Sequence, residues 1–265
     1  MEATASLSGP AVLYLYGLVP PTADLSGLAA IEEGAGVFLV SLDDVACAVT
    51  AVPAAAYEQP AASASAAEQL EWVTPRAWRH HEILRRLHVG GTVVPLKFGT
   101  LCSTAGQVEE MLRRFRAPIV ERLQHFTGKD EWTLRICHDA GAHAAAVQAR
   151  DPDLLALQDE IRALPEGRAY FMRKKLQRAT DALVAARLAA VEQQLVERVA
   201  AAGFELAVAE GQERGFPVLV ERARFATLET ILAELEAEHV DSHVSFELVG
   251  PWPPYSFTAA MDATS

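Results

Sequence analysis

Cysteine is scarce in this chain of 265 residues, and its placement excludes two kinds of site. Cys47, Cys102 and Cys137 stand far apart and share no paired spacing. A disulfide framework needs paired cysteines, and a structural zinc site needs closely spaced ones. Isolated cysteines fit a reducing compartment, so we expect a cytoplasmic protein without structural disulfides or a zinc site.

Long apolar runs and an excess of positive charge are also missing. No stretch reaches the roughly 18 apolar residues that a membrane helix needs, and the start, "MEATASLSGP", lacks the basic region of a signal peptide. Lysine and arginine number 23 against 35 acidic residues, which gives a net charge of −12. We therefore expect no membrane insertion and no nucleic-acid partner. The 51% of apolar residues is enough for a folded core.

The common catalytic motifs do not occur either. The sequence has no G-x-S-x-G, no P-loop and no G-x-G-x-x-G. His80 and His81 are neighbours, so on a helix they point about 100° apart and cannot bind one metal ion together. The sequence is therefore poor in catalytic signals, and we predict no cofactor and no metal.

Periodicity and turn residues predict alternating strands and helices in both halves. Thr74 and Pro75 have the residue types of an N-cap and a first helical position, and Trp78, Ile83 and Leu87 suit one buried face of the helix that follows. Asp24 is a candidate cap for an earlier short helix. The first half is predicted as strand 11–19, helix 23–32, a strand pair within 36–52 around the turn at 42–44, helix 74–87, strand 91–100, and helix 105–126 kinked at Pro118.

The second half repeats this order with a much longer first helix. It is predicted as strand 131–139, helix 151–164, long helix 166–203, strands "FELAVAE" and "FPVLVERARF" joined through "GQERG", helix 226–239 and strand 243–250. Strand, helix, strand, strand, helix, strand is the split βαβ order of a ferredoxin-like sandwich. We therefore predict an α+β protein of two domains. Residues 1–127 form a ferredoxin-like N-terminal domain. Residues 128–265 form an α+β C-terminal domain with the long helix and a C-terminal strap of aromatic residues and prolines.

Three segments are candidates for contacts with a partner. In "VVPLKFGT", a lysine interrupts an apolar strand and is expected to face away from its neighbours. "GRAYFMRKKLQR" is a basic stretch in an acidic chain. This stretch is either a solvated helix face or a surface for an acidic partner. "PWPPYSF" is a stiff segment that either packs on its own chain or presents aromatic rings to another protein. The candidate residues are Pro95, Lys97, Phe98, Arg168, Tyr170, Arg173, Lys174, Trp252, Tyr255 and Phe257.

Taken together, these segments carry a resemblance. "YLYGLV", "VVPLKFGT", "GRAYFMRKK" and "GPWPPYSF" follow one another across nearly the whole chain, and the ordered set resembles the gas vesicle protein GvpL/GvpF family. The family usually has arginine where Lys97 stands, so the charge is kept but the planar guanidinium is lost.

The resemblance implies a role that composition does not show. Such proteins are non-enzymatic accessory proteins of gas vesicles, the hollow protein shells that give cells buoyancy, and their N-terminal part is ferredoxin-like. They are minor vesicle components that act in nucleation and assembly by contacting the small hydrophobic shell protein and other accessory proteins. We hypothesise that an acidic adaptor covers an apolar face of the shell protein while its own charge keeps the complex dispersed.

Three other functions remain open on the sequence alone. A protein of two ferredoxin-like domains is also compatible with a regulator that binds a small molecule between them, and a ligand-dependent shift in melting would reveal it. A small enzyme would need Lys97, His81 and a carboxylate in one pocket. A nucleic-acid module is the weakest alternative, because the net charge is −12.

Overall fold

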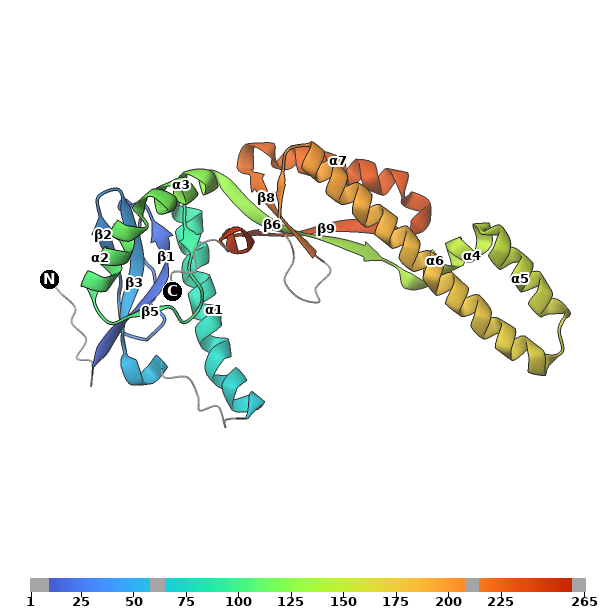
Figure 1. Cartoon of the computed structure of the whole chain (residues 1–265), viewed down its shortest axis with the longest axis horizontal. Coiled ribbons are helices and arrows are strands. Elements are labelled where there is room, and N and C mark those ends of the chain that lie inside the picture. Colours follow the sequence, from blue (N-terminus) through green and yellow to red (C-terminus); the bar gives the residue numbers. More distant parts are fainter. Residues whose placement is uncertain (1–9, 58–64, 208–214, 259–265) are drawn as a thin grey trace. The chain divides into compact units, whose positions relative to one another are not determined.

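The chain forms two compact units (Figure 1). The computed structural model describes residues 10–57, 65–207 and 215–258. Among these, the first unit contains the residues up to Glu131 and those from Pro251 onward, and the second contains Trp132–Gly250. The predicted division after residue 127 placed the C-terminal strap in the second domain, whereas the structure groups it with the first unit. Independent folding of the two domains stays a prediction.

The sheet of the first unit is built around β1 (Ala11–Val19). Seven consecutive residues of β1, from Leu13 to Val19, are buried, as in a strand covered on both faces. The sheet order is β2-β3-β1-β4, and β5 also pairs with β1; every one of these pairings is antiparallel. The other strands are β2 (Val37–Leu42), β3 (Val45–Pro53), β4 (Val94–Pro95) and β5 (Leu101–Cys102).

The first long helix starts earlier than the sequence predicted. α1 spans Ala66–Gly90, and its N-cap is Ser65. The Ser65 hydroxyl accepts from the backbone N–H of Glu68, whose carboxylate accepts from the backbone N–H of Ser65. This capping box makes Thr74 and Pro75 wrong as the helix start, and Pro75 lies inside the helix. Of the predicted buried face, Ile83 and Leu87 are buried, but Trp78 is 65% exposed.

Two other local predictions in the first unit are wrong. Residues 23–32 form turns instead of a helix, and the Asp24 carboxylate accepts from the backbone N–H of Ser26 in an Asx turn. The ferredoxin-like detail is therefore not confirmed. The single helix predicted over 105–126 is two helices, α2 (Ala105–Arg114) and α3 (Arg116–Phe126). The break falls at Phe115 because the ring of Pro118 conflicts with a helical carbonyl at position 114.

The second unit contains a sheet of the same relative order. Its strands are β6 (Lys129–His138), β7 (Glu205–Leu206), β8 (Gly215–Glu221) and β9 (Val244–Trp252), arranged β7-β8-β6-β9. In both units the first strand thus lies between the third and the fourth. Most of the predicted "GQERG" connection lies outside the described residues. The mixture of helices and sheets in both units confirms the α+β class.

The helices of the second unit largely follow the prediction. α5 (Pro152–Ala163), α6 (Glu166–Ala201) and α7 (Phe225–Glu238) confirm three predicted helices. The alanine-rich helix α4 (Ala140–Arg150) had not been predicted. Short 3-10 helices complete the described chain: η1 (Ala54–Tyr57), η2 (Arg222–Arg224), η3 (Val240–Ser242) and η4 (Tyr255–Phe257).

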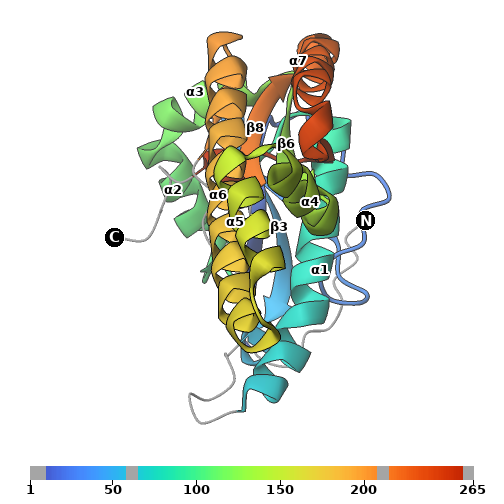
Figure 2. The ribbon, with the colours of Figure 1, turned by 90° about the vertical axis from the view of Figure 1, so that its right-hand side faces the viewer.

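The long helix α6 has two kinds of surroundings. Leu195 and Val199, near its C-terminal end, belong to the core of the second unit with Leu134 of β6 and Leu232 of α7. The N-terminal part lies beside α4 and α5 (Figure 2). Within the described residues, no helix is long and apolar enough to cross a membrane.

Candidate partner-contact surfaces

The predicted site residues fall into the two units. Pro95, Lys97 and Phe98 and the C-terminal strap belong to the first unit, whereas the basic stretch of α6 belongs to the second. Phe98 and Tyr255 both pack against the hydrophobic core of the first unit. The structure therefore brings two of the three candidate segments to one core and leaves the third in the other unit.

The segment "VVPLKFGT" forms a short strand and a turn instead of the predicted strand over 91–100. Only Val94–Pro95 pairs with β1, and Pro95 is buried opposite Gly17. Lys97 is exposed in a turn, where its carbonyl accepts from the Thr100 N–H and hydroxyl. The Phe98 ring packs edge-on against Tyr14 and His80. Lys97 is therefore the one residue of these three whose side chain is exposed.

The strap, residues 251–257, is held against the first unit by polar contacts at three side chains. The backbone N–H and the hydroxyl of Ser256 both donate to the Glu131 carboxylate, each at 2.8 Å. The Tyr255 hydroxyl hydrogen-bonds to Nδ1 of His81 at 2.8 Å, and Arg122 donates to the Phe257 carbonyl at 3.2 Å. The strap therefore packs on its own chain, which was one of the two roles that the sequence left open.

Burial controls the ionisation of the groups that hold the strap. It raises the pKa of Glu131, although the two hydrogen bonds from Ser256 act in the opposite direction. Burial also raises the pKa of Tyr255 and lowers that of His81. Phe257 is 7% exposed, and Trp252 is half-buried with its ring 5.6 Å from that of His81. Trp252 and Tyr255 thus keep part of their surface in solvent, whereas Phe257 does not.

The first turns of α6 present aromatic rings beside positive charges. Tyr170 is 53% exposed and Phe171 is 72% exposed. The Lys174 ammonium lies 4.9 Å from the centroid of the Tyr170 ring, a cation–π distance. Arg173 pairs with Glu166 at 3.1 Å. We call this the α6 surface; its basic residues are Arg168, Arg173, Lys174, Lys175 and Arg178.

Two exposed aromatic side chains on helices were missed by the sequence reasoning. Phe171 was not singled out, and Trp78 was assigned to a buried helix face. The surrounding sequence gives no signal for exposure, because an apolar helix face has the same residue pattern whether it packs on a core or lies in solvent. Glu131, His81 and Arg122, which hold the strap, were not predicted for this role either.

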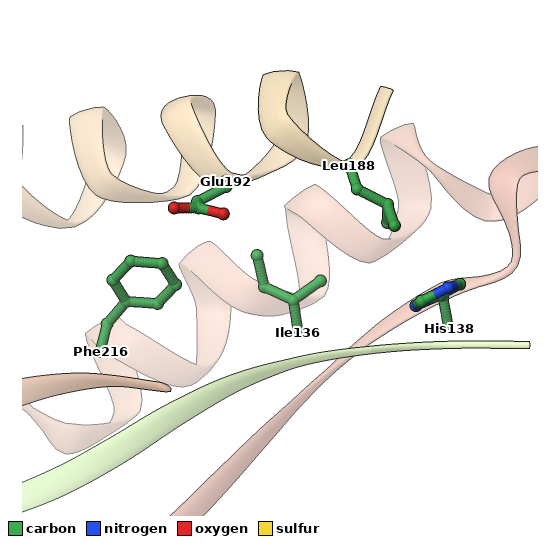
Figure 3. A pocket seen from close by; sticks show the side chains of 5 residues that line it. All are labelled: Ile136, His138, Leu188, Glu192 and Phe216. Atoms are coloured by element: carbon green, nitrogen blue, oxygen red, sulfur yellow. The ribbon is translucent and has the colours of Figure 1, made fainter. Parts of the chain in front are cut away.

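A cavity of about 30 Å³ in the second unit is lined by Ile136, His138, Leu188, Glu192 and Phe216 (Figure 3). That volume is enough for about one water molecule. The described residues contain no cluster of three or more histidine, cysteine, aspartate or glutamate side chains suited to a metal ion. His81, which the enzyme hypothesis joined to Lys97, hydrogen-bonds to Tyr255.

Comparison with known proteins places the chain in a family. The family described as "Gas vesicle synthesis protein GvpL/GvpF" matches residues 12–259. Gas vesicle protein F of Streptomyces sp. (strain CB03234) is 28% identical over 67% of this chain and 75% of its own length. Gas vesicle protein L of the same organism is 27% identical over 81% of this chain and 80% of its own length.

Solved structures with the same fold also exist. The crystal structure of the gas vesicle protein GvpF from Anabaena sp. PCC7120 superposes with a TM-score of 0.68 at 17% identity, covering 94% of this chain and 98% of that one. GvpF from Microcystis aeruginosa gives a TM-score of 0.57 at 16% identity, covering 93% and 98%. At these identities the likeness establishes the fold.

Proposed function

The chain belongs to the gas vesicle synthesis protein GvpL/GvpF family, and from this premise we propose that it acts when a gas vesicle is nucleated and assembled. Membership gives it an accessory role in gas vesicles. In our proposal it is a minor vesicle component without enzymatic activity. It contacts the small hydrophobic shell protein and other accessory proteins, and it needs neither nucleic acid nor a membrane.

The α6 surface is the observation that supports the proposal most directly. Two neighbouring aromatic side chains, Tyr170 and Phe171, are more than half exposed, although burying such rings is favourable. Aromatic and arginine side chains are the types enriched where proteins bind one another. The five cations within 166–178, against Glu166 alone, favour a partner with an acidic as well as an apolar face.

The charge of the whole chain supports the adaptor mechanism. A hydrophobic shell protein tends to self-associate before assembly. A chain with a net charge of −12 that covers part of that apolar surface gives the complex a repulsive charge and keeps it dispersed. In this mechanism the α6 surface contacts the partner, while the acidic remainder of the chain stays in solvent.

Co-expression of the tagged chain with the shell protein and the other accessory proteins tests the proposal. We expect the wild-type chain to recover at least one of them in a dispersed complex. The double variant Tyr170→Ser, Phe171→Ser removes apolar contact area and is expected to lower recovery by about tenfold or more. Val240→Ser is the matched control, because Val240 is an exposed apolar residue of the same unit, 67% exposed.

The result that overturns the proposal is equally direct. If the tagged chain purifies alone while every partner is expressed and dispersed, the adaptor mechanism is wrong. If the complex forms with the double variant as with the wild type, the α6 surface is not the contact.

The strap offers a second contact, and one residue tests it. Phe257 is buried in the first unit. Changing Trp252, Tyr255 and Phe257 to alanine together would therefore destabilise the fold, and lost partner binding could not be told from unfolding. Trp252→Ala alone removes a half-buried ring. The hydrogen bonds of Tyr255 to His81 and of Ser256 to Glu131 stay in place. Reduced recovery of a partner with unchanged unfolding would make Trp252 a contact residue, and unchanged recovery would leave the strap with its structural role.

A further inference from the structure

Helix α4 is attached to the second unit through few apolar side chains. Of its 11 residues, His143 and Val147 are buried. Helix α7 of the same unit buries three leucines, Leu228, Leu232 and Leu235. Buried apolar area is the main favourable contribution that holds a helix on its neighbours. We therefore expect α4 to separate from the unit at a lower cost in free energy than α7.

Polar groups occupy the contact between α4 and α6, which lie side by side (Figure 2). The Gln148 side-chain amide of α4 donates to the Thr180 hydroxyl at 3.0 Å. Thr180 is fully buried and donates to the Leu176 carbonyl at 2.9 Å. From α5, the Gln158 amide donates to Gln148 Oε1 at 3.4 Å. Water replaces such hydrogen bonds when helices separate, so they hold the contact only weakly.

The one histidine buried in α4 has no compensating hydrogen bond. The side chain of His143 is fully buried, and neither ring nitrogen has a hydrogen-bond partner within the described residues. The ring of His138, from β6, stands edge-on to it with the centroids 5.8 Å apart. A protonated ring at this place would bury two unpaired N–H donors and a charge. The packed form of α4 therefore disfavours a proton on His143.

The groups that interact electrostatically with His143 are cations or become cations in acid. They are His138 of β6, Arg187 of α6 and His243, which directly precedes β9. Burial lowers the pKa of His143, and these three groups lower it further. Three elements around α4 thus oppose the same proton.

The carboxylates of this region act on the other two histidines. Asp139, the N-cap of α4, accepts from the Ala142 N–H at 2.8 Å and interacts with His138 and His243. Glu192 of α6 lines the small cavity together with His138 (Figure 3). The charged side chains of α5 are exposed: Asp153, Asp159, Glu160 and Arg162. Protons on His138 and His243 therefore have carboxylates nearby, whereas the groups that interact with His143 repel a proton.

We propose that α4 is an acid-released helix: at mildly acidic pH it separates from α6, and His143 takes up a proton in the open form. In the open form the ring is solvated and has the ordinary histidine pKa of about 6.5, which is higher than in the closed form. The open form thus binds the proton more readily, and falling pH favours it. Below about pH 6.5 the opening equilibrium constant rises by up to about tenfold per pH unit, the limit for one proton.

Opening exposes the buried side chains of Val147 and Thr180 on the two separated helices. Acid therefore uncovers a helix face that is closed at pH 7. The inference stands independently of the proposed function, because none of these residues belongs to the α6 surface and the release needs no partner.

Amide hydrogen exchange of the chain alone tests the release. Protection factors, which divide out the pH dependence of intrinsic exchange, are compared for α4 and α7 at pH 7 and pH 5. We expect protection in α4 to fall by about tenfold or more, against a limit of about 25-fold for one histidine. Protection in α7 should stay the same, because its leucines carry no titrating group.

Matched variants assign the effect to one ring. His143→Leu should give α4 the same protection at both pH values. His239→Gln changes a partly exposed histidine of the same unit and should keep the wild-type fall. Arg187→Gln removes a fixed positive charge that opposes the proton, so it should make the fall smaller. This variant keeps the test decisive if His143→Leu does not fold.

Three results would overturn the release of α4. Protection in α4 that is the same at pH 7 and pH 5 rejects it directly. An equal fall in α4 and α7 means that acid unfolds the whole unit. A fall that persists in His143→Leu, or that Arg187→Gln leaves unchanged where His143→Leu does not fold, assigns the effect to another group. The co-expression result for the proposed function bears on none of these readings.

Discussion

The two units share a strand order but differ in how they use it. In each, the first strand lies between the third and the fourth. The first unit connects its first two strands by turns and leaves β2 as a six-residue edge. The second unit connects them through α4, α5 and α6, and its corresponding strand, β7, has two residues. The α6 surface that we propose for partners lies where the units differ.

A buried histidine from each unit shows different surroundings. His80 in the first unit is 5% exposed and hydrogen-bonds to the Tyr14 hydroxyl at 2.9 Å. His143 in the second unit is fully buried, and neither of its ring nitrogens has a hydrogen-bond partner in the described part of the chain. The burial of the His80 ring is thus compensated by a hydrogen bond, whereas the burial of the His143 ring is not.

The largest expected effect tests whether the strap belongs to the first unit. Phe257→Ala removes a buried ring and should destabilise the first unit by about 3 kcal/mol. Amide hydrogen exchange under native conditions should show faster exchange in β1 and β3, with β8 unchanged. Val240→Ser, at an exposed position, is the control. Faster exchange confined to β8 would assign the strap to the second unit.

Acidification should weaken the first unit through His80. Burial lowers the pKa of His80 to about 4, below the value of about 6.5 in an unfolded chain. As pH falls through this window, the unfolded chain binds a proton that the folded chain does not. Stability is therefore complete above pH 6.5 and falls by about 3 kcal/mol as pH approaches 4.

Urea unfolding between pH 7 and pH 4.5 measures this loss, with His80→Gln as the comparison. The variant lacks the titrating ring, so it should be less stable at pH 7 but lose less stability on acidification. Parallel pH curves for the two proteins would show that His80 is not the group responsible.

Glycines in the two sheets should differ in their tolerance of alanine. A Cβ at Gly17 would lie 2.8 Å from Val93 Cγ2 and 2.9 Å from the Val94 carbonyl oxygen. Backbone cannot move aside as a side chain can, so Gly17→Ala should cost about 2 kcal/mol or more. At Gly215 the close atom is Thr133 Cγ2, and the nearest backbone oxygen is 3.8 Å away. Gly215→Ala should cost less, and equal shifts in urea midpoint would contradict the difference.

The smallest effect, and the one stabilising change, is expected at His143. His143→Leu replaces an unpartnered polar ring by an apolar side chain and should stabilise the second unit by up to about 1 kcal/mol. His80→Leu is the matched change in the first unit, and it should destabilise because the Tyr14 hydroxyl loses its hydrogen bond to His80 and keeps the one from the Gly99 N–H. The urea midpoints of both variants at pH 7 decide the matter, and a destabilised His143→Leu would mean that this ring is satisfied in solution.

Much of the candidate site could not be predicted from local patterns. The residue types of the strap predicted a stiff aromatic segment, but its hydrogen bonds to Glu131 and His81 join residues far apart in the sequence. The sequence likewise predicted the basic stretch of α6, while the exposure of Phe171 depends on how little of the chain covers that end of the helix. The place of β2 at the end of its sheet follows from the sheet order, which no local pattern specifies.

The sequence by itself determined the elements that depend on neighbouring residues. Alternation and turn residues specified the hairpin of β2 and β3, periodicity specified α5, α6 and α7, and the ordered motifs identified the GvpL/GvpF family. The tertiary structure alone decided that residues 23–32 form turns, that Trp78 is exposed and that the strap packs on the first unit. Local patterns report backbone preference and which residues share a face, whereas burial depends on the distant segments that cover that face.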